Sequence, residues 1–246
     1  MNKRISTIFA LVLSALFLMA CSVSGFGLVR GSGKVVNETR QVSGFDRVEI
    51  KDGGSLYLIQ GTQESLEIEA EDNIMPYVQS RVVNNTLILE LDDTVNKSFF
   101  TTRPIKYYLT MKDVHGLAIS GGGDIETSNI TTDTLLADIS GGGNLRIDVL
   151  KANSLNVNVS GGGDIDILNG EVPEQNIRVS GGGNYDARDL SSQNVTANVS
   201  GGGDLTVWVE GTLDVNVSGG GSVYYYGKPA VNSSISGGGD VIQREK

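Results

Sequence analysis

The sequence has little of what metal centres and disulfide-stabilised folds require. Among its 246 residues there is one cysteine, Cys21, and one histidine, His115. Single residues of these types exclude His-based metal sites, Cys/His zinc sites and disulfide scaffolds. The 33 glycines fall far short of the one residue in three that a collagen triple helix needs. The hydrophobic content of 39% is too high for a disordered chain, so one large or two small folded domains are expected.

Basic residues are also scarce. The 19 Lys and Arg residues are outnumbered by 29 Asp and Glu residues, which gives a formal net charge of −10. A surface of this sign repels phosphate backbones. We therefore expect no nucleic-acid partner.

The N-terminus has the pattern of an export signal. A basic start containing Lys3 and Arg4 precedes a mainly apolar run over residues 5–20. This run is shorter than the roughly 20 residues that span a bilayer, so residues 1–20 are predicted to be a cleaved signal peptide. The run ends in Leu18-Met19-Ala20-Cys21, which resembles the lipobox of bacterial lipoproteins. The resemblance implies that Cys21 carries a lipid and becomes the new N-terminus.

A lipidated Cys21 makes the membrane an expected partner and the cell envelope the expected location. In a Gram-negative host, Ser22 after the cysteine resembles proteins sorted to the outer membrane. Residues 21–33, rich in Gly and Ser, are predicted to be a flexible tether. The alternative is an ordinary cleaved signal with a cysteine at its junction.

A repeat dominates the rest of the chain. The tetrapeptide Ser-Gly-Gly-Gly occurs seven times, spaced by 20 residues four times and then by 18 twice; it begins at Ser120, Ser140, Ser160, Ser180, Ser200, Ser218 and Ser236. A β-branched residue precedes every one of these serines, and apolar residues alternate with polar ones on both sides of the glycines. This alternation predicts strands with one buried face, joined at a glycine-rich corner.

One such unit buries too little apolar surface to be stable alone. Stacking equivalent strands in parallel, about 4.7–4.9 Å apart, gives each strand hydrogen-bonding partners and creates continuous inward aliphatic columns. We therefore predict an all-β fold, a parallel β-helix with coils of about 20 residues over residues 117–246. A β-sandwich would need no fixed period. The glycines are interpreted as corners that exclude a Cβ atom, because no helical segment follows them as in a phosphate-binding loop.

A polar column follows the glycines. Its members alternate between acids and neutral residues: Asp124, Asn144, Asp164, Asn184, Asp204, Ser222 and Asp240. Neutral side chains between the acids separate like charges and allow hydrogen bonds along the stack. Calcium binding, by analogy with other Asp-containing glycine-rich repeats, is the alternative, but these carboxylates are not clustered as a hard cation requires. We expect no metal and no cofactor.

Residues 34–116 lack the glycine triplet but keep the strand pattern, as in residues 55–60 and 87–91. Two interpretations remain open. These residues form irregular first coils of the same column, or they form a cap that protects its open end from edge-to-edge pairing.

The whole pattern resembles the bacterial auto-transporter adhesin head domain, also called the GIN domain and formerly a domain of unknown function. The resemblance covers roughly residues 45–240. Four features carry it: Val42-Ser43-Gly44-Phe45-Asp46, Gly53-Gly54-Ser55-Leu56, Glu71-Asp72-Asn73-Ile74 and the Ser-Gly-Gly-Gly-Asp repeats, where family members typically have Ser-Gly-Ser-Gly-Asp. It implies a right-handed parallel β-helix on an exported, frequently lipidated protein, with no established catalytic residues.

The outward acids do not predict an enzyme. Glu126, Asp166 and Asp186 share a column that Arg146 and Thr206 interrupt, and no inserted loop is present to build a cleft. The lone His115 is expected at a turn, as a solvated or capping side chain. We expect no catalytic residue, and a polysaccharide-acting enzyme is the weaker alternative.

A binding face has more support. One outward column is predicted to hold Ser128, Asp148, Leu168, Arg188, Trp208, Tyr226 and Arg244, with Tyr224 beside it. Aromatic rings next to arginines bind sugar rings and protein partners. The candidate ligand-binding residues are therefore Arg188, Trp208, Tyr224, Tyr226 and Arg244, with a glycan or a cell-surface protein as partner. The alternatives are a covering loop, a dimer contact, or a passive structural envelope protein without a ligand.

Overall fold

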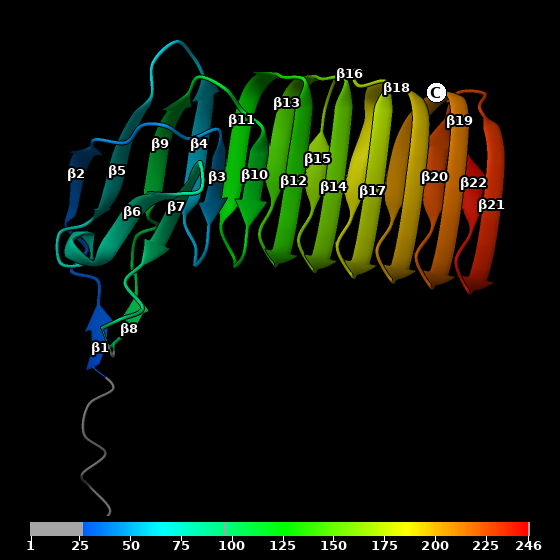
Figure 1. Cartoon of the computed structure of the whole chain (residues 1–246). Helices are drawn as coiled ribbons and strands as arrows, with labels where there is room; N and C mark the ends of the chain where they lie inside the picture. The colour runs from blue at the N-terminus through cyan, green and yellow to red at the C-terminus, as the bar shows by residue number, and fades with distance from the viewer. Residues whose placement is uncertain (1–26, 96, 246) are drawn as a thin grey trace, which may run out of the picture.

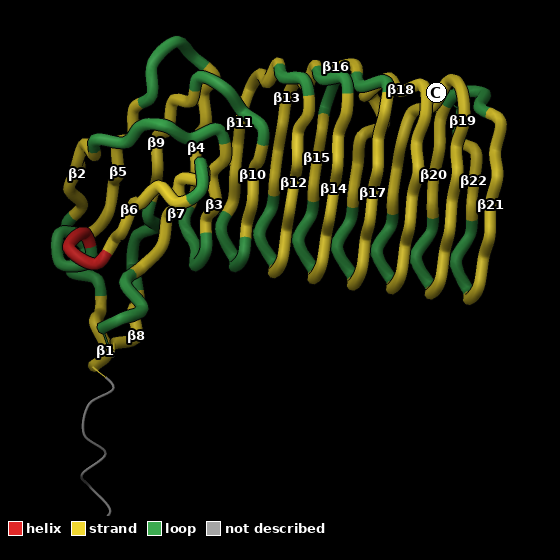
Figure 2. The backbone as a smooth tube through the Cα atoms, viewed as in Figure 1, coloured by secondary structure: helices red, strands yellow, loops and turns green. Residues whose placement is uncertain are grey.

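The computed structural model describes residues 27–95 and 97–245. The predicted signal peptide and the lipid-attachment residue Cys21 lie outside the described residues. The strands stack into one elongated column in which glycine-containing corners follow one another along an edge (Figures 1 and 2). None of the described segments forms a helix that could cross a bilayer.

The column is built from two stacks of strands, named sheet 1 and sheet 2. Sheet 1 has the spatial order β6 (Val78–Val83), β7 (Thr86–Leu91), β3 (Arg47–Ile50), β10 (Gly116–Ile119), β12 (Thr134–Gly141), β14 (Ser154–Gly161), β17 (Glu174–Gly181), the second halves of β18 (Tyr185–Gly201) and β19 (Leu205–Gly219), and β21 (Ala230–Gly237).

Sheet 2 has the order β2 (Val35–Arg40), β5 (Ser65–Glu71), β9 (Lys106–Met111), β4 (Ser55–Gln60), β11 (Asp124–Thr131), β13 (Leu145–Lys151), β15 (Ile165–Ile167) with β16 (Gly170–Glu171), the first halves of β18 and β19, β20 (Val223–Tyr226) and β22 (Val241–Gln243). A separate pair is formed by β1 (Gly27–Arg30) and β8 (Lys97–Phe100), and a 3-10 turn, η1, spans Met75–Tyr77.

The strand register confirms the predicted parallel β-helix. Ile139 of β12 lies opposite Val159 of β14, which in turn lies opposite Val179 of β17. All three side chains are at most 2% exposed. They pack in the core with the apolar residues that follow the corners, such as Ile165. Burial of these continuous aliphatic columns is the main stabilising contribution, since no single coil has a core of its own.

The corner at Gly161–Gly163 shows what each glycine of the triplet does. The carbonyl of Gly141, one coil below, accepts hydrogen bonds from the amides of Gly162 and Gly163. A Cβ on Gly161, whose φ is +141°, would lie 2.3 Å from that carbonyl oxygen, and a Cβ on Gly163 would lie 2.1 Å from another. A Cβ on Gly162 would meet nothing within 4 Å. The predicted steric exclusion is therefore confirmed for the first and third glycines and wrong for the middle one.

The polar column forms the hydrogen-bonded ladder that its composition predicts. The Asn144 side chain donates to Asp124 Oδ1 at 2.9 Å, and Asn184 donates to Asp164 Oδ1 at the same distance. The backbone amide of Asn184 also donates to that Asp164 oxygen at 2.8 Å. These bonds give the carboxylates a structural role. Across the part of the chain that the structure describes, no group of three or more His, Cys, Asp or Glu side chains is arranged to hold a metal.

The N-terminal region contains both kinds of element that the sequence left open. Strands β3 and β4 stack in parallel on β10 and β11 and so continue the column. Beyond them the pairing becomes antiparallel, from β9 through β5 to β2 and from β7 to β6. The outermost strands, β2 and β6, carry the charged residues Glu38, Arg40 and Arg81, which discourage further pairing at these edges.

The buried carboxylate of Glu71 fixes the segment around Gly33 against the loop that contains Thr102. Glu71 is 1% exposed, and it accepts hydrogen bonds from the amides of Gly33 at 2.7 Å and Thr102 at 2.9 Å. Burial raises the pKa of Glu71, but the hydrogen bonds from Thr102 and Gly33 outweigh it and lower the pKa below its usual value. Four residues of the predicted flexible tether, Gly27–Arg30, instead form β1, paired with β8.

Candidate ligand-binding surface

The change from 20-residue to 18-residue coils alters the outward surface of sheet 2. Ala187 of β18 lies opposite Val207 of β19, but the next paired residue, Ser191, lies opposite Trp208. The strand register therefore shifts between Ala187 and Ser191. The predicted single column that joins Arg188 to Trp208 is wrong, because the shorter coil of β19 pairs Trp208 with Ser191 and the register passes over Arg188.

Trp208 instead lies opposite Tyr226 on the next coil. Val207 and Val209, on either side of the tryptophan, are fully buried, so Trp208 projects from the outer face. Both Trp208 and Tyr226 are half-buried. The indole Nε1 of Trp208 donates a hydrogen bond to the Glu210 carboxylate, which fixes the orientation of the ring.

Tyr224 and Arg244 form the second part of the surface. The guanidinium carbon of Arg244 lies 4.6 Å from the centroid of the Tyr224 ring. The Arg244 backbone amide donates to the Tyr225 carbonyl at 2.8 Å, which ties the residues after β22 to β20. Arg244 follows Gln243, which pairs with Tyr225, and its side chain reaches sideways from the column of Tyr226 to cover Tyr224.

Arg188 is held at the edge of the same region. Its Nε atom lies 3.0 Å from both carboxylate oxygens of Asp186, and a second nitrogen of its guanidinium also bonds this carboxylate. Hydrogen bonding to Asp186 and the charge of Asp186 raise the pKa of Arg188, and Tyr226 and Asp189 act in the same direction. We name the set of Arg188, Trp208, Tyr224, Tyr226 and Arg244 the aromatic cluster.

The structure separates the acids of the outward column. Burial raises the pKa of Asp166, and the neighbouring Asp186 and Asp164 add to this shift. Glu126 lines a cavity of about 250 Å³ together with Arg146 and Asp148, whereas Asp166 and Asp186 do not line it. Outside this column, Nδ1 of His115 lies 3.4 Å from a carboxylate oxygen of Asp46.

A polar groove on sheet 1 was not identified from the sequence. It has a volume of about 490 Å³ and crosses β14, β17, β18, β19 and β21. Arg178 and four valines line it together with amide and hydroxyl side chains on successive coils, namely Asn158, Asn198, Asn216, Ser160, Ser180, Ser200, Ser218, Ser234 and Ser236. The sequence contains the pattern from which the groove could have been predicted, because these polar residues recur at equivalent outward positions of the repeat.

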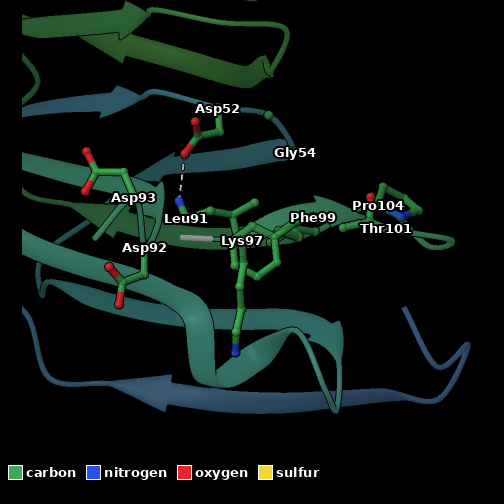
Figure 3. Close-up of a pocket in the computed structure, with 11 residues that line it drawn as sticks. Asp52, Gly54, Leu91, Asp92, Asp93, Lys97, Phe99, Thr101 and Pro104 are labelled. Atoms are coloured by element: carbon green, nitrogen blue, oxygen red, sulfur yellow. Dashed lines mark hydrogen bonds between the residues drawn. The ribbon is translucent and has the colours of Figure 1, made fainter. Parts of the chain in front are cut away.

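The N-terminal end contains a pocket of about 550 Å³ (Figure 3). Figure 3 shows Asp92 and Asp93 at one end of this pocket and Thr101 and Pro104 at the other. Asp92 accepts hydrogen bonds from the amide and hydroxyl of Thr94 at 2.9 and 2.6 Å, and Asp52 accepts one from the amide of Leu91 at 2.7 Å, so both carboxylates hold the adjoining loop.

One solved structure is similar to this chain over its whole length. A protein described as a "putative adhesin" from Bacteroides fragilis has a TM-score of 0.82 and 29% sequence identity, and the match covers 88% of this chain and 100% of that one. A "putative lipid binding protein" from Parabacteroides distasonis has a TM-score of 0.72 and 19% identity, over 89% of this chain and 100% of that one. The second likeness shows the fold alone.

A third structure, a "putative adhesin" from Parabacteroides merdae, has a TM-score of 0.69 and 17% identity, and the match covers 89% of this chain and 100% of that one. No curated protein matches the sequence. A family model matches residues 44–229. The resemblance drawn from the repeats is thereby confirmed, and the chain belongs to the family described as "Putative auto-transporter adhesin, head GIN domain".

Proposed function

We propose that this chain is a non-catalytic adhesion module, exported and attached to the cell envelope through a lipid on Cys21. The lipobox-like residues before Cys21 support the anchor. The family and the related structures are described as adhesins or as a lipid-binding protein rather than as enzymes, which supports a binding role at the envelope. In a Gram-negative host, Ser22 favours the outer membrane.

The shape of the column supports this arrangement. Strand β1 lies at the end that carries β2, β5 and β6, and β20, β21 and β22 lie at the opposite end (Figure 1). Seven strand-to-strand steps separate β3 from β21 in sheet 1. At about 4.8 Å a step they span about 34 Å. An anchor before β1 therefore holds the aromatic cluster away from the membrane.

The observation that carries the binding role is the Arg244–Tyr224 contact beside the opposed Trp208 and Tyr226. A guanidinium over an exposed ring contributes about 0.5–1 kcal/mol and orients the ring. Rings on adjacent coils provide an apolar surface with charged rims, to which a sugar ring or a protein side chain binds. We propose a glycan or a protein of another cell surface as the ligand, and a passive spacer as the alternative.

Replacing Trp208, Tyr224 and Tyr226 together by Ser is expected to reduce cell adherence and glycan binding by tenfold or more. The measurements are a glycan array with the full chain and adherence of cells that display it. The matched control replaces Ser180, Ser200 and Ser218 by Ala in the polar groove of sheet 1. Arg244→Gln, which leaves all the rings in place, is expected to weaken binding less. Unchanged adherence by a folded triple variant would favour the passive spacer.

Replacing Cys21 by Ser is expected to release the chain from the membrane fraction, because only the thiol accepts the lipid. Fractionation of cells and metabolic labelling with a fatty acid measure this directly. Ser22→Ala, a change at the neighbouring residue, serves as the control and should stay in the membrane fraction with its label. A Cys21→Ser chain that remains membrane-bound would contradict the proposed anchor.

A further inference from the structure

The last strand of sheet 1 has an open edge. On one side β21 pairs with β19, from Thr212 opposite Ala230 to Gly219 opposite Gly237. Within residues 27–95 and 97–245 no strand pairs with its other side, and all eight residues of β21 are exposed. Figure 1 shows β21 at the end of the column furthest from β1. A strand in this position presents unpaired backbone amides and carbonyls to any further strand.

The composition of β21 leaves this edge unprotected. The strand reads Ala-Val-Asn-Ser-Ser-Ile-Ser-Gly, without a charge, a proline or a bulge. The outermost strands at the other end, β2 and β6, contain Glu38, Arg40 and Arg81. Charges of this kind are the usual means of preventing edge pairing. Although the chain has a net charge of −10, two copies of β21 meet without repulsion between charges on the strand itself.

The side chains at this edge also leave part of the apolar core uncovered. Val231 and Ile235 belong to inward columns, yet they are 37% and 46% exposed. Leu213 and Val217, which occupy the same columns one coil earlier, are at most 2% exposed. The difference arises because another coil covers Leu213 and Val217, whereas none of the described coils covers Val231 or Ile235.

We propose that this edge binds a second copy of the same chain, through antiparallel pairing of β21 with β21 of the partner. A two-fold axis perpendicular to the sheet produces this pairing, and such an interface is self-complementary by construction. A register centred on Ser233 places Val231 opposite the partner's Ile235 and Ile235 opposite the partner's Val231. It keeps the inward columns of both copies on the same side, so that the two cores become continuous.

The size of the surface makes the contact weak and reversible. Eight residues extend about 26 Å, and two packed sheets are about 10 Å apart. An end face of these dimensions is smaller than the roughly 800 Å² that each partner contributes to a standard interface. Many anchored copies would compensate through multivalency. On the proposed anchoring, the open edge faces away from the membrane, so columns on two cells meet end to end.

A charge exchange on the outward face of β21 tests the pairing. A register centred on Ser233 places Asn232 opposite the partner's Ser234, and both side chains point outward. Sedimentation velocity of the full chain in mild detergent is expected to show a reversible dimer. The double variants Asn232→Lys with Ser234→Lys, and Asn232→Asp with Ser234→Asp, each place like charges opposite one another and should weaken self-association at least tenfold, whereas an equimolar mixture of the two should restore it. Ser218→Lys, at an exposed outward position on β19, is the control and should dimerise like the unmodified chain. A chain that remains monomeric, or a dimer that both double variants leave unchanged, would overturn the proposal.

Cross-linking gives an independent measurement. Residue 233 lies on the proposed axis, where directly opposed Cβ atoms are about 4.5–5.5 Å apart, close to disulfide geometry. In a Cys21→Ser background, which has no other thiol, Ser233→Cys should form a covalent dimer under mild oxidation, and Ser218→Cys should form little. Equal cross-linking at both positions would refute this register. Neither test involves a glycan or the lipid, so its failure is distinct from failure of the proposed adhesion function.

Discussion

Replacing Gly163 by Ala is expected to destabilise the protein by about 3 kcal/mol or more, because the new methyl group meets the backbone of the preceding coil. The added Cβ would lie 2.1 Å from the Gly143 carbonyl oxygen and 2.8 Å from a methyl carbon of Ile139. The carbonyl belongs to the stacked corner and cannot rotate away as a side chain does. The coil must separate from its neighbour, which removes ladder hydrogen bonds and opens the core.

Two other glycines provide controls for this prediction. Gly162→Ser should change stability by less than about 0.5 kcal/mol, because a Cβ at this position meets nothing within 4 Å. In Gly239→Ala the new Cβ atom would lie 1.9 Å from a carbonyl oxygen. This substitution should nevertheless reduce the free energy of unfolding less than Gly163→Ala does, because Gly239 lies in the last described coil, which has a neighbouring coil on one side only. Thermal and denaturant unfolding measure all three, and equal losses for Gly162→Ser and Gly163→Ala would refute the corner model.

Replacing Gln175 by Leu is expected to destabilise the protein by about 2–4 kcal/mol, although it restores an unbroken aliphatic column. Gln175 lies between Leu155 and Val195 in an inward column and is 1% exposed. Its side-chain oxygen accepts a hydrogen bond from the Tyr185 hydroxyl at 2.6 Å, and its nitrogen donates to the Ser192 hydroxyl. Leucine would leave two buried hydroxyl groups without this partner, each at a cost of about 1–3 kcal/mol.

Removing the whole network should reverse most of this loss. The triple variant Gln175→Leu, Tyr185→Phe and Ser192→Ala has no hydroxyl of the network left to satisfy, so its stability should approach that of the unmodified protein. Burial raises the pKa of Tyr185 far above its ordinary value, so the phenol remains a donor throughout the accessible pH range. The denaturant midpoints of the single and triple variants measure this difference in stability. A triple variant less stable than Gln175→Leu alone would show that the network is not the cause.

The repeat determined much of the fold directly from the sequence. A period of 20 residues places Ile139, Val159 and Val179 at equivalent positions, and alternation with period two tells which side chains face inward. Both signals are local, so they predict the stacking without knowledge of distant contacts. The acid–amide ladder follows for the same reason, because equivalent side chains of adjacent coils lie one spacing apart. Residues of the aromatic cluster were likewise identified by their outward positions.

Only the tertiary structure decided three other features. The placement of Trp208 opposite Ser191 depends on where along the coil the 18-residue repeat is shorter than the 20-residue repeat. An alignment on the glycine triplets shows that two residues are missing, but not at which positions. The antiparallel strands β2, β5 and β6 depend on pairing between segments without a repeat. Gln175 breaks its apolar column, and its partners Tyr185 and Ser192 lie on the facing part of the next coil. A repeat specifies contacts between equivalent positions, whereas each of these features depends on contacts between residues that are not equivalent.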